Sequence, residues 1–194
     1  MSDQSQLFFT AAGTLPEGFV YRPDFITMDE ERALLEGIAE LPLEDVRMHG
    51  VTARRRVKHF GWIYGYDSWE IEPGPPVPPF LLPLRERAAA WMAVPPDTLE
   101  EILISEYRPG ATIGWHRDAP MFGPAVLGVS LLGACRFRFR RGKIRRWQMA
   151  ELTLEPRSAY LIAGPARRDW QHSIPGTKTL RYSITFRTLA EARR

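Results

Sequence analysis

The 194-residue sequence has one cysteine, Cys135, and no apolar run that approaches the roughly 20 residues needed to span a bilayer. A single cysteine cannot form a disulfide within the chain or build a zinc finger, and it suits a reducing compartment. The first residues also lack the basic and long apolar stretches of a secretory signal. These absences predict a cytoplasmic protein that does not enter membranes.

Acidic residues are missing from the long interval between Asp118 and Glu151, although the net charge of the whole chain is only +3. The basic residues of that interval are Arg136, Arg138, Arg140, Arg141, Lys143, Arg145 and Arg146. A second basic group at 54–58 is followed closely by aromatic residues. Basic side chains beside aromatic ones are typical of nucleic-acid surfaces, where they contact phosphates and bases. The alternative is a solvated basic face, which most charge runs form.

The first half of the chain has helical periodicity. Thr27 and Glu30 have the spacing of a capping box, and apolar residues then recur on one face, which predicts a helix over 28–41. A proline-rich connector follows at 73–80. Apolar residues at helical spacing after it predict a second helix that ends near residue 94.

From residue 99 onward, short strand-like segments replace the helical pattern. They cover 99–107, 124–133, 135–140, 150–156, 158–164 and 179–188. Strands that follow helices confined to the first half predict a mainly β protein with flanking helices (α+β), built as a jelly roll. In the predicted hairpin near 135–147, Cys135, Phe137 and Phe139 would share one face and the arginines the other.

Only four histidines occur, and one of them belongs to an H-x-D pair made by His116 and Asp118. In an extended segment both side chains leave the same face of the strand. With a distant histidine such as His172, they would form the two-histidine, one-carboxylate site of non-haem Fe(II) oxygenases, which leaves positions open for an oxoacid and O2. The same ligands would also suit the Zn²⁺ of a hydrolase. H-x-D alone arises easily by chance.

The last predicted strand carries two arginines on one face, because Arg181 and Arg187 are six residues apart. That face could simply be solvated. If it faced the interior of a jelly roll, two buried guanidinium groups would need anionic partners. A dicarboxylate such as 2-oxoglutarate would supply them through bidentate contacts.

Four motifs occur in a fixed order: Y-x-P-G at 107–110, H-x-D at 116–118, His172, and RYSITFR at 181–187. Together they resemble the AlkB family of 2-oxoglutarate oxygenases over residues 99–189. The resemblance implies a double-stranded β-helix, which is another name for the jelly roll. It also implies one AlkB-like domain over 1–194, with N-terminal helices and a nucleotide-recognition flap in 1–98 and the catalytic core in 99–189.

The resemblance assigns Fe(II) to His116, Asp118 and His172, with 2-oxoglutarate and O2 as co-substrates. Arg181 would bind the distal carboxylate of 2-oxoglutarate, and Arg187 would lie near its metal-chelating end.

Three further residues are implied near the co-substrate. Tyr107 would donate a hydrogen bond to it, and Ser105 and Ser183 stand where founding family members have asparagine. Pro120 stands where those members carry a second acidic residue that engages the damaged base.

The segment at 54–66 falls where the family has its flap. Trp62 and Tyr64 are candidates to contact a flipped base, and Arg56 and Lys58 are further candidates for substrate binding. The alternative is that Trp62 and Tyr64 are core residues of a hairpin. RRVKHFG at 55–61 also resembles the segment of family members that act on tRNA wobble uridines.

These features predict oxidative demethylation of N-alkylated bases in DNA or RNA, in single strands or with the base flipped out. The alternatives are hydroxylation of a modified tRNA uridine or a protein side chain, and a non-catalytic, basic jelly roll that binds nucleic acid. We expect a monomer.

Overall fold

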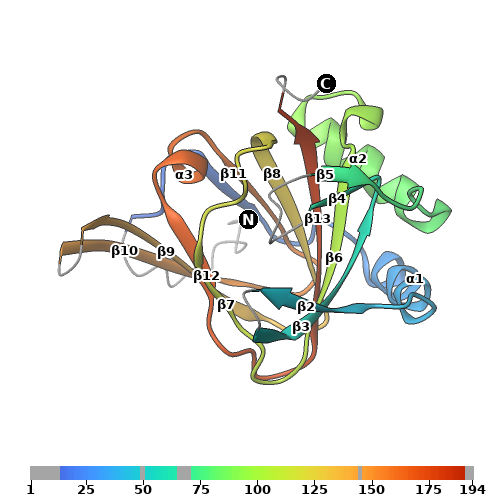
Figure 1. The fold of residues 1–194 in the computed structure, drawn as a ribbon, viewed down its shortest axis with the longest axis horizontal. Coiled ribbons are helices and arrows are strands. Elements are labelled where there is room, and N and C mark those ends of the chain that lie inside the picture. The colour runs from blue at the N-terminus through green and yellow to red at the C-terminus, as the bar shows by residue number, and fades with distance from the viewer. Residues whose placement is uncertain (1–13, 49–50, 65–70, 144–145, 191–194) are drawn as a thin grey trace, which may run out of the picture.

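A computed structural model describes residues 14–48, 51–64, 71–143 and 146–190 (Figure 1). Two antiparallel sheets face each other in it. The seven-stranded major sheet has the order β1-β11-β8-β13-β6-β3-β2. Its strands are β1 (Phe19–Arg22), β2 (Glu44–Met48), β3 (Val51–Phe60), β6 (Glu101–Tyr107), β8 (Phe122–Leu131), β11 (Ala159–Ala163) and β13 (Arg181–Leu189).

The minor sheet has the order β10-β9-β12-β7. Its strands are β7 (Ile113–His116), β9 (Cys135–Lys143), β10 (Arg146–Leu154) and β12 (Gln171–Ile174). A small separate sheet pairs β4 (Trp62–Tyr64) with β5 (Ile71–Pro73). The predicted mainly β jelly roll with flanking helices is confirmed.

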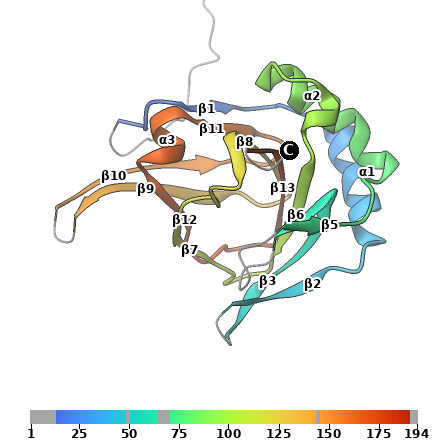
Figure 2. The ribbon, with the colours of Figure 1, turned by 45° about the horizontal axis from the view of Figure 1, so that its top comes forward.

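Two longer helices, α1 (Met28–Ala39) and α2 (Leu82–Met92), lie on the side of the major sheet away from the minor sheet (Figure 2). The predicted capping box is present, because Thr27 and Glu30 each accept a hydrogen bond from the other's backbone N–H. Leu34 and Leu84 join a core cluster with Ile184 of β13. None of the described helices is long and apolar enough to cross a membrane.

The shorter helical elements are η1 (Pro79–Leu81), η2 (Pro96–Thr98) and α3 (Gly164–Arg168). Gly61 separates β3 from β4 with a φ of +77°, and a Cβ there would lie 1.9 Å from the carbonyl oxygen of Glu100. The chain therefore changes direction at Gly61 where other residues would be strained.

β13 lies between β6 and β8 in the centre of the major sheet, and eight of its nine residues are buried. Ile184 and Phe186 face the helices, where they join the outer core cluster. Because side chains alternate along a strand, Arg181 and Arg187 face the space between the two sheets. The solvated alternative for these arginines is wrong.

The β9–β10 hairpin extends beyond the barrel (Figure 1). Cys135, Phe137 and Phe139 are buried between the sheets, whereas the arginines between them are exposed or half-buried. The predicted alternation is confirmed.

Candidate metal and co-substrate site

Three side chains converge between the two sheets. Two of them belong to strands β7 and β12 of the minor sheet, and the third lies in the loop that follows β7. His116 ends β7 and is directly opposite His172 of β12, because the two residues are register partners. Asp118 follows two positions later. One ligand atom from each of the three lies within 4.8 Å of the others, a spacing that a single cation can bridge. The structure therefore brings together the three predicted ligands.

The histidines of this cluster are in the form that a metal requires. Burial lowers the pKa of His116, and burial followed by the neighbouring His116 lowers the pKa of His172 to about 3. Nδ1 of His116 lies 2.9 Å from the carbonyl oxygen of Gly114, which can only accept. Nδ1 therefore carries the proton and Nε2 keeps its lone pair.

Asp118 is the anionic member of the cluster. Burial by itself would raise its pKa, but the charge of Arg187 leads the opposing influences, which hold that pKa well below its usual range. Arg187 Nη2 lies 3.0 Å from Asp118 Oδ1, and His172 Nε2 lies 3.7 Å from Oδ2. Two neutral imidazoles and one ionised carboxylate are the ligand states that divalent cations bind.

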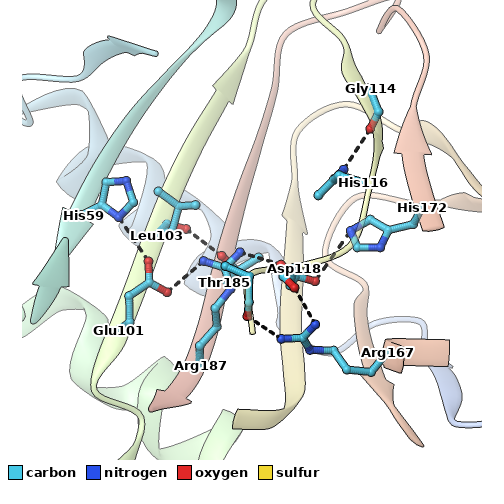
Figure 3. A network of polar contacts seen from close by, with 11 residues as sticks. His59, Glu101, Leu103, Gly114, His116, Asp118, Arg167, His172, Thr185 and Arg187 are labelled. Carbon is cyan, nitrogen blue, oxygen red and sulfur yellow. Dashed lines mark hydrogen bonds and ion pairs between the residues drawn. The ribbon is translucent and has the colours of Figure 1, made fainter. Parts of the chain in front are cut away.

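A chain of polar contacts leads from Asp118 to the major sheet (Figure 3). Arg187 Nη1 donates to Oε2 of Glu101 at 2.9 Å, and Nδ1 of His59 lies 3.2 Å from the other oxygen of the same carboxylate. Glu101 is fully buried, and it is the register partner of Arg187 across β6 and β13. No sequence pattern indicates that Glu101 or His59 belongs to this site.

Arg167 of α3 fixes the loop that contains Asp118. Its guanidinium donates to the main-chain oxygens of Asp118 and Ala119 at 2.8 and 2.9 Å. The sequence does not reveal this arginine either, because α3 has only five residues and no periodicity that would indicate its orientation.

Arg181 provides a test of whether the site fits an acidic co-substrate. It is completely buried, and Nη2 donates to Ser130 Oγ at 3.0 Å, but Nε and Nη1 have no hydrogen-bond partner. Its guanidinium carbon lies 5.0 Å from the ring centroid of Tyr107. Buried donors without acceptors are costly, and a carboxylate would satisfy two of them at once. The site therefore fits both a divalent cation and an oxoacid.

A cleft of about 1330 Å³ contains the metal-ligand cluster, and Arg181 lies behind its wall, against the ring of Tyr107. Tyr107, Ser105 and Ser183 line it, and the two serines are register partners on β6 and β13. Pro120 also lines the cleft, so the position of the family's second acidic residue is at the site but carries no charge. Asp118 is the only acidic residue among the described residues that line the cleft. The arginines that line it are Arg55, Arg117, Arg167, Arg168 and Arg187.

The predicted substrate residues of β3 lie elsewhere. Arg56 makes a two-point contact with Glu106 at 3.0 and 2.7 Å, and Lys58 contacts Glu44 at 2.8 Å. Neither lines the cleft, whereas Arg55 and His59, on the other face of the strand, do. Alternation along β3 accounts for this, since the side chains at 55 and 59 leave the face opposite to those at 56 and 58.

Of the two residues predicted to contact a base, Trp62 and Tyr64, the structure describes the side chain of Trp62 alone. Trp62 is half-buried and packs against a cluster of Met121, Phe122 and Leu189, of which Phe122 and Leu189 line the cleft. Trp62 therefore borders the site. The side chain of Tyr64 lies outside the described residues, so its predicted contact with a base stays a prediction.

Comparisons with known proteins agree with this geometry. Residues 18–187 match the family described as the 2OG-Fe(II) oxygenase superfamily. The chain is 28% identical to the "Alkylated DNA repair protein ALKBH8 homolog" of Arabidopsis thaliana, over 83% of this chain and 51% of the relative. It is 26% identical to "tRNA (carboxymethyluridine(34)-5-O)-methyltransferase alkbh8" of Xenopus tropicalis, over 85% of this chain and 26% of the relative.

A third relative is the "Probable RNA/DNA demethylase ALKBH6" of Danio rerio, 29% identical over 60% of this chain and 47% of that protein. The chain thus spans about half or less of the length of these three curated relatives. The solved structure of OsALKBH1 superimposes with a TM-score of 0.66 at 15% identity, over 90% of this chain and 98% of that one, and shows the shared fold. The chain belongs to the 2OG-Fe(II) oxygenase superfamily as an AlkB homologue, and it is an enzyme that uses Fe(II) and 2-oxoglutarate.

Proposed function

We propose that this enzyme oxidises an N-methyl group on a base of DNA or RNA that enters the cleft from a single strand or flipped out of a duplex. The observation that carries the proposal is a single cleft that contains the His116, Asp118 and His172 cluster. Five arginines and one carboxylate, that of Asp118, are among its described lining residues. A nucleic acid, whose phosphates contact the arginines while one base enters the interior, matches this distribution of charge.

In this proposal His116, Asp118 and His172 would hold Fe(II), and the metal would supply the activation of O2. Arg181 binds the distal carboxylate of the co-substrate, and Tyr107 orients it. One oxygen atom of O2 enters succinate and the other enters the methyl C–H bond, with release of CO2. The resulting N-hydroxymethyl group then breaks its C–N bond, which gives formaldehyde and the unmodified base.

The dimensions of the cleft support a substrate beyond the co-substrate. Small-molecule sites usually enclose about 300–1,000 Å³, and this cleft of about 1330 Å³ exceeds that range. Trp62 borders the cleft through Phe122 and Leu189 and is our candidate to contact the base. Tyr64 is its predicted companion.

A second candidate function is hydroxylation of a substituent on a tRNA uridine. The Xenopus relative is named for a carboxymethyluridine of tRNA, and the five arginines of the cleft would tolerate a substrate with an additional carboxylate. The reaction would insert oxygen into a C–H bond whose product is stable, so no formaldehyde would be released.

The deciding experiment combines Fe(II), 2-oxoglutarate and O2 with methylated DNA and RNA oligonucleotides and with uridine-modified tRNA. Succinate and formaldehyde are measured separately. Demethylation predicts formaldehyde in proportion to the methylated base consumed, whereas uridine hydroxylation predicts a heavier nucleoside without formaldehyde. If no nucleic acid raises succinate formation above the uncoupled rate, both candidates fail.

The ligand assignment has its own test. His116→Ala, Asp118→Ala and His172→Ala should each nearly abolish both turnover and Fe(II) binding, because one of three protein ligands is removed. Arg32→Gln on exposed α1 is the control. Wild-type iron affinity in any one of the three alanine variants would remove that residue from the ligand set.

A further inference from the structure

The outer face of the minor sheet carries a stack of arginine and tryptophan side chains. Trp115 of β7 lies under Arg138 and Arg140 of β9, with guanidinium carbons 4.9 and 4.6 Å from its ring centroid. Arg140 also lies 4.4 Å from the ring centroid of Trp147 on β10. We call these four residues the arginine–tryptophan face. They point away from the metal cluster, because Trp115 alternates with His116 along β7.

The arginines of this face are held by neutral groups. Arg138 Nε donates to Ser173 Oγ at 3.2 Å, and Arg140 Nε donates to Gln171 Oε1 at 2.8 Å, both on β12. These contacts orient the guanidinium planes, and the one carboxylate beside them is Glu151, the register partner of Arg138, which pairs with Arg136. All four strands of the minor sheet therefore contribute to one rigid, cationic platform.

Carboxylates are almost absent from this sheet. Within the ranges of its four strands the only acidic residue is Glu151, and Arg136 pairs with it. Trp147 remains 37% exposed. Planar aromatic and guanidinium groups next to positive charge are what single-stranded nucleic acids bind, through stacked bases and phosphate contacts.

We propose that the arginine–tryptophan face binds the single-stranded segment of nucleic acid that flanks the base in the cleft. The inference rests on the proposed function for the identity of the partner. The platform and the cleft are continuous at β7, since Trp115 and Arg117 both line the cleft. A strand whose target base enters the cleft crosses this edge and continues over the outer face toward the β9–β10 hairpin.

The test measures binding without catalysis. Fluorescently labelled single-stranded RNA and DNA oligonucleotides are titrated anaerobically with the full chain, Fe(II) and 2-oxoglutarate at several salt concentrations. Arg138→Gln combined with Arg140→Gln should weaken binding to every sequence and reduce the slope of log affinity against log salt by up to about 0.7 for each phosphate that is no longer neutralised. Trp147→Ala should weaken binding about fivefold or more and leave the salt slope unchanged.

Three controls make the outcome decisive. Arg32→Gln removes one exposed positive charge from α1, on the other side of the molecule, and should bind like the wild type. Arg140→Lys keeps the charge but not the planar stack, so its salt slope should be normal and its affinity reduced. Thermal unfolding of each variant verifies that it is folded.

Wild-type binding by both the double variant and Trp147→Ala would overturn the proposal, as would equally tight binding of a polyglutamate peptide. The result is separable from the proposed reaction. Oligonucleotides that bind through this face but are never oxidised would refute the demethylation proposal alone. If oligonucleotides are oxidised but bind the variants as tightly as the wild type, only the proposed binding face is refuted.

Discussion

Arg181 has the largest of the fully buried side chains, and its charge is matched by no carboxylate among the described residues. Removing such a charge from water is unfavourable. The contacts of Arg181 with the ring of Tyr107 and the hydroxyl of Ser130 compensate for only part of the lost hydration energy. The enzyme thus keeps a destabilising group in place for a ligand. Folding stability and co-substrate affinity should respond in opposite directions when that group is removed.

Arg181→Met tests this trade-off. Loss of a charge-assisted, two-point interaction costs about 1.5–3 kcal/mol, so we expect the apparent KM for 2-oxoglutarate to rise about tenfold to over a hundredfold. The melting temperature without ligands should stay the same or rise, because the uncompensated charge is gone. An unchanged KM would remove Arg181 from the co-substrate site.

Glu101 is the second residue whose burial indicates a role. It balances the charge of Arg187, which otherwise competes with a bound cation for Asp118. Glu101→Gln should therefore weaken Fe(II) binding about tenfold, the equivalent of about 1.4 kcal/mol, and change the KM for 2-oxoglutarate less. Anaerobic metal titration measures the effect. Glu44→Gln, which removes an exposed carboxylate, is the matched control, and equal iron affinity in both variants would contradict this positioning role.

Some residues of the site could be predicted from local sequence patterns, whereas others are positioned only by the pairing of distant strands. Arg181 and Arg187 could be predicted because the period of two along β13 places both on one face. His116 ends β7 and Asp118 lies in the loop after it, so this pair could be found from its H-x-D spacing rather than from a strand that contains both. Glu101 could not be predicted, since its role comes from the register of β6 against β13. Three consecutive arginines at 54–56 contain no period-two signal, so the sequence could not show that Arg55, rather than Arg56, faces the cleft.

At the scale of elements, α1 is held at its first turn. Glu30 pairs with Arg87 of α2 and also takes part in the capping box with Thr27, and these contacts lower its pKa to about 2. A carboxyl with a depressed pKa stabilises the fold above its ordinary pKa of 4.5, and that contribution disappears as the pH falls toward 2. The pair is partly exposed, so solvent reduces the effect.

Thr27→Ala should lower the free energy of unfolding by about 1 kcal/mol, because one backbone N–H of the first turn loses its acceptor. For a chain of this size the melting temperature should fall by about 2–4 °C. Thr27→Ser retains the hydroxyl and should stay near the wild type. Equal losses in both variants would mean that the methyl group, not the cap, accounts for the stability.

Long elements were predictable and short ones were not. The capping box and the apolar spacing of α1 give local signals over twelve residues. β12 has four residues and α3 has five, and no alternation or helical period develops over such lengths. β12 is a strand because β7 and β9 pair with its two edges, which is a tertiary cause that a local pattern does not contain.

At the scale of the whole molecule, the site joins the two sheets. His116 and His172 belong to the minor sheet, whereas Arg181 and Arg187 belong to β13 of the major sheet. A cation and an oxoacid bound together would link the sheets across the barrel. Ligands that bind only the folded chain raise its stability by mass action.

We therefore expect a rise in melting temperature with Fe(II) and 2-oxoglutarate under anaerobic conditions. At about 100 times the dissociation constant the gain is about 2.7 kcal/mol, which corresponds to about 5–10 °C at about 2–4 °C per kcal/mol. Differential scanning calorimetry measures it. His116→Ala should show little of this shift, and a full shift in that variant would place the stabilising ligand elsewhere.

The projecting hairpin has a consequence for self-association. β10 ends the minor sheet, and no strand of the described residues pairs with the outer edge of its nine residues, so another copy could add a strand there. Any such pairing would bring Arg141, Lys143 and Arg146 of two hairpins close together. Repulsion between these like charges opposes the addition of further copies at this edge, so the hairpin protects the free enzyme from aggregation. Because salt screens such repulsion, we expect aggregation to increase at high salt.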